Sequence, residues 1–139
     1  MNVHLLSIND KDLIIKTKEL IERYHNDDFV SFIDTRKTYL LLDDDNVLGY
    51  ASFNVIKPEV DVLYVFIEEV ERSKGYGFYL LNTIFNSLKD DGINRIFLEV
   101  DVRNSNAIKL YEKLGFKEIS RRTNYYDNIS DAICMEVVL

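Results

Sequence analysis

The chain has 139 residues, 47% of them hydrophobic and 12% aromatic, which excludes a disordered protein and suffices for one domain with a buried core. Its formal net charge of -7 disfavours nucleic-acid binding, because phosphate contacts need a basic face. One cysteine and two histidines exclude an internal disulfide and leave a zinc site without its usual ligands, so we expect no metal.

The N-terminal third is predicted to begin with a strand and a helix. Residues 1–6 fit a short first strand. Asn9 or Asp10 can cap the helix that follows, which extends to about Arg23. Its apolar residues recur at helical spacing, namely Leu13, Ile14, Leu20 and Ile21. Residues 26–37 fit one or two short helical turns.

Three strands are predicted next. Residues 38–42 and 47–55 flank the acidic turn Asp43–Asn46, a pattern typical of a hairpin. After Pro58, residues 60–67 form an almost continuous apolar run of strand length, rich in β-branched and aromatic side chains. We therefore expect residues 60–67 to form a buried central strand in the middle of the sheet.

The C-terminal half alternates helices and strands. An amphipathic pattern over 75–90 predicts a helix, and 95–100 predicts a strand. Asn104 can cap a second helix, which Gly115 ends, and further strands follow from Phe116 to Leu139. Strands that pair through hairpins and also bracket helices indicate an α/β fold, with a mixed sheet and helices on both of its faces.

No linker or low-complexity tract divides the chain, so we expect a single domain over residues 1–139. No segment approaches the roughly 20 apolar residues of a membrane span, and the first residues do not resemble a signal peptide. We therefore expect a soluble, cytoplasmic protein whose partners include neither a membrane nor a nucleic acid. A homodimer is one assembly that we consider.

The loop before the 75–90 helix has the pattern Arg72-x-x-Gly75-x-Gly77. Free N–H groups at a helix N-terminus, together with the positive end of the helix dipole, bind anions, and glycine lets a phosphate approach the backbone closely. The alternative is that the two glycines simply open a turn. The dinucleotide-binding fingerprint fits poorly, because its third glycine would fall at Leu80.

This loop resembles the acetyl-CoA loop of the GNAT superfamily, Arg/Gln-x-x-Gly-x-Gly/Ala after a central strand. The resemblance extends from Val65 to Val138 through several short motifs: Leu98-Glu99-Val100, Asn104-x-x-Ala107, Leu110-Tyr111-Glu112-Lys113-Leu114-Gly115-Phe116, Asn124-Tyr125-Tyr126 and Asp131-Ala132-x-x-Met135. Together these motifs are most similar to the ribosomal-protein-alanine N-acetyltransferases, the RimI-like enzymes. The resemblance implies a GNAT fold with a mostly antiparallel sheet of about 6–7 strands.

The resemblance also implies acetyl-CoA as co-substrate, an amine as acceptor, and roles for individual residues. Glu99 falls on the position of the family's proton acceptor, and Tyr111 on that of its proton donor. Tyr125 and Tyr126 match residues that line the acceptor groove. The residues that match cofactor-binding positions are Val65, Phe66 and Ile67 for the pantetheine arm, Arg72, Ser73, Lys74, Gly75, Tyr76 and Gly77 for the pyrophosphate, and Asn104.

Strand alternation bears on Glu99 without any family comparison. It places Ile96, Leu98 and Val100 on one face of a strand and leaves Glu99 on the other, where a carboxylate in an otherwise apolar strand needs a partner or a purpose. A salt-bridged or edge-exposed glutamate is the structural alternative. For Tyr111, the alternative is a core aromatic residue with its hydroxyl at the surface.

Three departures from the ribosomal enzymes leave the acceptor open. Asp101 stands where those enzymes commonly have arginine, residues 26–37 lack their Pro-Trp feature, and no proline accompanies the glutamates before the loop. We expect transfer to the N-terminal α-amine of a protein or peptide. The alternatives are a small-molecule amine, such as a polyamine or an amino sugar, and a non-catalytic acyl-CoA-binding module. Cys134 is expected to be a packing residue.

Overall fold

The computed structural model of the protein describes residues 1–24, 37–126 and 129–139. Its strands are β1 Asn2–Leu5, β2 Lys37–Asp43, β3 Asn46–Ile56, β4 Glu59–Ile67, β5 Arg95–Asp101, β6 Lys117–Tyr126 and β7 Ser130–Val138. Its helices are α1 Lys11–Tyr24, α3 Tyr76–Asp90 and α4 Ser105–Lys113, with a 3₁₀ turn, η1, at Glu69–Glu71. The expected helical turns at 26–37 lie almost wholly outside the described residues.

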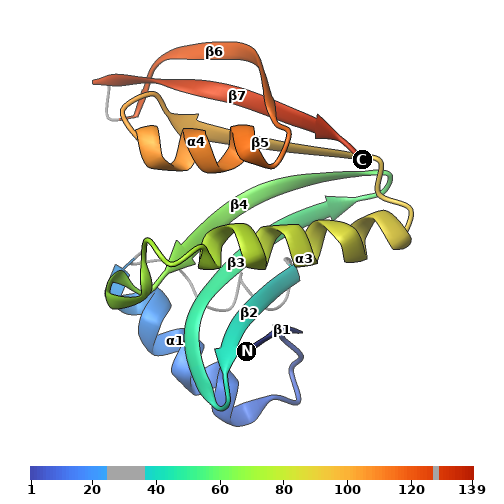
Figure 1. Ribbon diagram of the computed structural model, residues 1–139, viewed down its shortest axis with the longest axis vertical. Helices are drawn as coiled ribbons and strands as arrows, with labels where there is room; N and C mark the ends of the chain where they lie inside the picture. Colours follow the sequence, from blue (N-terminus) through green and yellow to red (C-terminus); the bar gives the residue numbers. More distant parts are fainter. Residues whose placement is uncertain (25–36, 127–128) are drawn as a thin grey trace.

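Within the described residues, the seven strands form one sheet in the order β1-β2-β3-β4-β5-β7-β6 (Figure 1). Every neighbouring pair is antiparallel except β4 and β5, which run parallel. This confirms the predicted mixed, mostly antiparallel sheet. It also confirms the hairpin around Asp43–Asn46, because β2 and β3 pair directly across that turn.

Helices cover both faces of the sheet, as the sequence predicted. The apolar face of α3, including Leu81 and Ile84, packs into the larger core cluster with residues of β2 to β5 and β7. On the opposite face, Leu20 and Ile21 of α1 contribute to a second cluster that includes Tyr50 of β3. The sheet is therefore the middle layer of the fold, with α3 and α4 on one side and α1 on the other.

The burial of β4 differs from the prediction. The strand lies fourth of seven, as expected, but only Val60 and Phe66 are buried. Its pairing with β5 ends at Asp61, and a β-bulge at Leu63 interrupts its ladder with β3. Beyond Asp61, β4 and β5 diverge (Figure 1). The apolar residues of β4 are therefore only partly buried, because β5 does not pair with this strand beyond Asp61.

The buried face of α3 should anchor this helix to the larger core cluster. We expect Ile84→Ala to lower the free energy of unfolding by about 2–5 kcal/mol, because Ile84 is 1% exposed and its truncation leaves a cavity. Urea denaturation followed by circular dichroism measures this. Ser87→Ala, on the exposed face of the same helix, is the control and should change stability by less than about 0.5 kcal/mol.

Candidate active site

Two cavities lie along consecutive stretches of β4, where it diverges from β5. The first, called here the loop cavity, has a volume of about 570 Å³ and is lined by Val65–Ile67, the loop before α3, and α4. The second, called here the strand cavity, has a volume of about 780 Å³ and is lined by residues 61–64 of β4 and by residues of β5, β6 and β7.

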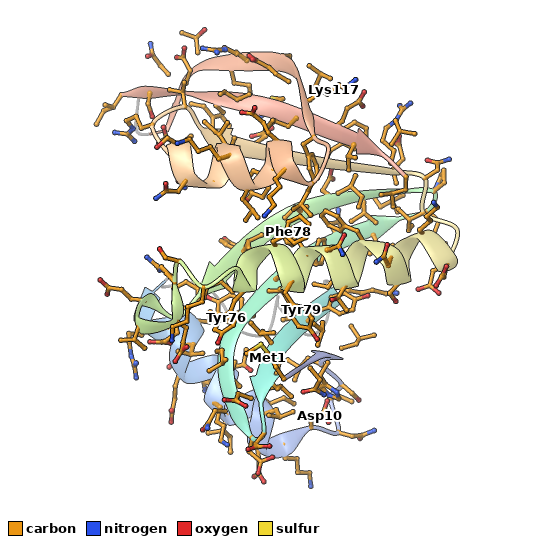
Figure 2. All side chains as sticks on the ribbon, in the orientation of Figure 1. Met1, Asp10, Tyr76, Phe78, Tyr79 and Lys117 are labelled. Atoms are coloured by element: carbon orange, nitrogen blue, oxygen red, sulfur yellow. The ribbon has the colours of Figure 1, made fainter. Side chains whose placement is uncertain are left out.

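The loop cavity gathers nearly all the residues that the sequence assigned to the cofactor. Those that line it are Val65, Phe66, Ile67, Arg72, Ser73, Gly75, Tyr76, Gly77 and Asn104. Lys74 does not line it. Three residues of the lining that the sequence analysis did not single out are Phe78 on α3, and Leu110 and Lys113 on α4. Phe78 lies on the side of α3 that faces α4 (Figure 2), and the Nζ of Lys113 is 4.6 Å from the centroid of its ring.

The two cationic side chains of the loop, Arg72 and Lys74, form hydrogen bonds within the protein. Arg72 donates from Nε to the carbonyl oxygen of Ile67 at 2.8 Å, which ties the loop to the end of β4. Lys74 donates from Nζ to Glu71 at 2.8 Å, and this hydrogen bond raises the pKa of the Lys74 amine. The loop therefore combines backbone N–H groups with two cationic side chains, of which Arg72 lines the cavity.

Gly75 and Gly77 serve different purposes. Gly75 is the N-cap of α3 with φ of 81°, a left-handed conformation that favours glycine, and no side chain caps this helix end. A Cβ added at Gly75 would meet nothing within 4 Å, so the approach to the first N–H groups of α3 is open. A Cβ at Gly77 would lie 3.2 Å from Cδ2 of Leu110, so this glycine lets α3 and α4 pack closely.

α4 supplies Asn104 and Tyr111 to the loop cavity. Asn104 is the N-cap of α4, and its Oδ1 accepts a hydrogen bond from the N–H of Ala107 at 3.2 Å. Tyr111 is buried, with its ring 5.8 Å from that of Phe116 in an edge-to-face contact. Tyr111 therefore packs in the core and also lines the cavity, while its role as proton donor stays a prediction.

Glu99 lies in the strand cavity, on the face of β5 opposite its buried residues, as alternation predicted. Its Oε1 is 3.1 Å from Nη2 of Arg122, and the Glu99 side chain is 29% exposed. The salt-bridge alternative is therefore correct as a description, while the carboxylate still lines the cavity. Arg122 was missed by the sequence analysis, although it lies two residues before the Asn124-Tyr125-Tyr126 segment that was noted.

Tyr125 also lines the strand cavity, and its ring centroid is 5.3 Å from Cζ of Arg122. The backbone of Tyr126 pairs with Ser130, but its side chain is outside the described part of the chain. Cys134 is directly opposite Glu99 in the β5–β7 ladder and is half-buried, so the expected packing residue also forms part of the cavity wall.

Asp101, the last residue of β5, connects this strand to the start of β7, near the strand cavity. It forms a two-pronged ion pair with Arg103, with Nη2 to Oδ2 at 2.6 Å, and accepts a hydrogen bond from Ser130 Oγ at 2.9 Å. These contacts, above all the Arg103 guanidinium, hold the pKa of the Asp101 carboxyl well below its usual range. Between β6 and β7, Asp131 Oδ1 accepts a hydrogen bond from the N–H of Asn124 at 2.9 Å.

Across 1–24, 37–126 and 129–139, no three His, Cys, Asp or Glu side chains gather as a metal would require. In the same part of the chain, no helix has both the length and the apolar composition to cross a membrane.

A model of the Acetyltransferase (GNAT) family matches residues 6–116 of the chain. The chain belongs to this family. The ribosomal protein bS18-alanine N-acetyltransferase of Salmonella typhimurium is 34% identical over 95 residues, which make up 66% of this chain and 64% of that protein. An N-alpha-acetyltransferase of Saccharolobus solfataricus is 34% identical over an alignment of 148 residues, which covers 92% of this chain and 87% of that protein.

The fold comparison agrees with the sequence comparison. The crystal structure of the ribosomal-protein-S18-alanine N-acetyltransferase from Escherichia coli matches with a TM-score of 0.83 and 26% identity, over 99% of this chain and 94% of that one. The predicted GNAT fold and the resemblance to the ribosomal-protein-alanine enzymes are confirmed. The sequence alignment spans less than two thirds of the Salmonella protein.

The contacts of Asp101 should stabilise the fold in a pH-dependent way. Because the folded state lowers its pKa, the contribution is complete above the unfolded pKa of about 3.9 and is lost as the pH falls through the folded value. We expect Asp101→Asn to lower the urea midpoint at about pH 6, and to lower it by progressively less as the pH falls below about 4. Asp90→Asn, at the exposed end of α3, is the control, and a pH-independent loss for Asp101→Asn would contradict the assignment.

Proposed function

We propose that the protein is an acetyl-CoA-dependent N-acetyltransferase that acts on the N-terminal α-amine of a peptide or protein. One observation carries the proposal: the N-terminus of α3 with its glycine loop, and the carboxylate of Glu99, line two cavities on consecutive stretches of β4. Acetyl donor and amine can then approach one point of the sheet from opposite faces. The names of the Salmonella and Saccharolobus relatives, both α-amine acetyltransferases, support the same acceptor class.

The residues of the loop cavity fit a coenzyme with a diphosphate and an extended arm. The N-terminus of α3 provides N–H groups and a helix dipole, and the space above Gly75 is open. Val65 to Ile67 line this cavity beyond the point where the ladder of β4 with β5 has ended, so an amide-containing arm can lie along this stretch of the strand. When bound, acetyl-CoA would supply an activated acetyl thioester.

Glu99 is proposed as the general base and Tyr111 as the general acid. Glu99 lines the strand cavity, from which the amine would arrive, and it would remove the ammonium proton through an ordered water. Tyr111 lines the loop cavity, from which the donor would arrive, and a phenol with a pKa of about 10 is acidic enough to protonate a departing thiolate. The transfer needs no covalent intermediate on the protein.

An α-amine suits this machinery better than a lysine side chain. With a pKa of about 8, roughly 10% of an α-amine is already neutral at about pH 7, whereas less than about 0.1% of a lysine amine is. The proposed base, Glu99, therefore has to deprotonate a smaller fraction of an α-amine than of a lysine amine. A panel of amines assayed by thiol release tests a polyamine or an amino sugar as acceptor. A non-catalytic module would bind coenzyme A and release no thiol with any amine.

The first test concerns the base. We expect Glu99→Gln to lower kcat for an alanine-starting peptide by roughly 10²–10⁴-fold, because glutamine cannot accept the proton. The affinity for coenzyme A, measured by isothermal titration calorimetry, should stay unchanged, since Glu99 lines the other cavity. Unchanged turnover would eliminate Glu99 as the base. Glu118→Gln is the control, because Glu118 is exposed on β6 and pairs with Arg121.

The second test concerns the loop. Asn and Asp have nearly the same shape and both tolerate the left-handed backbone of Gly75, so Gly75→Asn and Gly75→Asp differ mainly in charge. A carboxylate at the helix N-terminus competes with a phosphate for the same N–H groups. We expect the aspartate variant to bind coenzyme A at least about tenfold more weakly than the asparagine variant by calorimetry. Equal affinities would show that the diphosphate binds elsewhere.

A further inference from the structure

The strand cavity contains a cation that acetyl transfer to a simple amine does not require. The charged side chains among its described lining residues are Asp61, Glu99 and Arg122. The two carboxylates suit an incoming ammonium group, whereas the guanidinium repels it. Arg122 is nonetheless held inside the site, with Nη2 at 3.1 Å from Glu99 and Cζ at 5.3 Å from the centroid of the Tyr125 ring.

We propose that Arg122 binds a carboxylate group of the acceptor, so that the preferred acceptors carry a carboxylate close to the reacting α-amine. The inference rests on the proposed acetyl transfer and names the acceptor class for it. Arg122 thereby acts as a specificity-determining residue at the same site as the proposed base, Glu99.

The contacts of Arg122 leave part of its guanidinium available. Arginine has five N–H donors arranged as a planar fork, which matches a carboxylate with two parallel hydrogen bonds. Its ion pair with Glu99 uses Nη2, and among the described residues Glu99 is its only carboxylate partner. The Arg122 side chain is 58% exposed, so a ligand in the cavity can reach the remaining donors.

The surroundings of Arg122 also prepare it for binding. The Glu99 carboxylate and the face of the Tyr125 ring restrict the guanidinium before any ligand arrives. A side chain that is already restricted loses less conformational freedom on binding. Arg121 provides a contrast on the same strand, because its Nε is 2.6 Å from Glu118 Oε1 and it does not line the cavity.

The distribution of charge favours an acceptor with both signs. Two carboxylates and one guanidinium give the lining a net charge of about -1, which attracts an ammonium group. An acceptor carboxylate can then pair with Arg122, the cationic side chain among the described lining residues. A cationic side chain in that place would instead face the guanidinium, so acceptors with a basic residue next to the amine should be disfavoured.

A carboxylate near an α-amine has two sources. It is the α-carboxylate in a free amino acid and the side chain of an acidic second residue in a peptide. Alanine compared with alaninamide isolates the first source. A peptide that starts Ala-Asp compared with one that starts Ala-Asn isolates the second, because each pair differs by a carboxylate and an amide of nearly the same shape.

The experiment measures kcat/KM by thiol release for all four acceptors, with the wild type, Arg122→Gln, Arg122→Lys and the control Arg121→Gln. For the wild type we expect a preference of about tenfold or more for the carboxylate member of one pair, as for a hydrogen bond to a charged group. Arg122→Gln should abolish this preference, Arg122→Lys should retain part of it, and Arg121→Gln should leave it intact. Because each preference compares two acceptors on one enzyme, a general loss of activity cancels.

The outcomes separate the two levels of the proposal. Thiol release from all four acceptors without a preference in the wild type would overturn the role of Arg122 and leave acetyl transfer standing. A preference that survives in Arg122→Gln would likewise exclude Arg122 as its cause. No thiol release with these or any other amines would overturn the proposed function, and the inference with it. Circular dichroism of each variant checks that it folds.

Discussion

The short parallel pairing of β4 with β5 is the constraint on which the rest of the site depends. Only three residue pairs, from Glu59–Arg95 to Asp61–Phe97, join these strands before they separate (Figure 1). A sheet normally satisfies the backbone groups of a central strand on both edges. Here β4 has no ladder with β5 beyond Asp61, and the strand and loop cavities both lie along this stretch of β4.

In the proposed cofactor site, the loop before α3 supplies backbone N–H groups beside two anchored cationic side chains. Arg72 is committed to the carbonyl of Ile67, and Lys74 to Glu71. The result is a helix N-terminus held at a fixed place beside the end of β4, with an open approach over Gly75. Rigid N–H groups lose little freedom when an anion binds, so this arrangement favours affinity.

On the opposite face, the acceptor side depends on how β6 and β7 are attached to β5. Asp101 links the end of β5 to Ser130 at the start of β7, and Asp131 holds the backbone at Asn124. These contacts place Arg122 and Tyr125 of β6 across the cavity from β4. The acceptor preference proposed for Arg122 thus depends on a connection that lies outside the cavity itself.

The sequence by itself determined the order of elements, the mixed sheet and most of the proposed cofactor site. These follow from local patterns: the apolar spacing of α3, the alternation that turns Glu99 away from the core, and the glycines after Arg72. Only the tertiary structure decided that β4 diverges from β5, that Lys74 stays outside the loop cavity, and that Arg122 reaches Glu99. The physical reason is that these outcomes depend on contacts between strands far apart in the chain, which no local periodicity encodes.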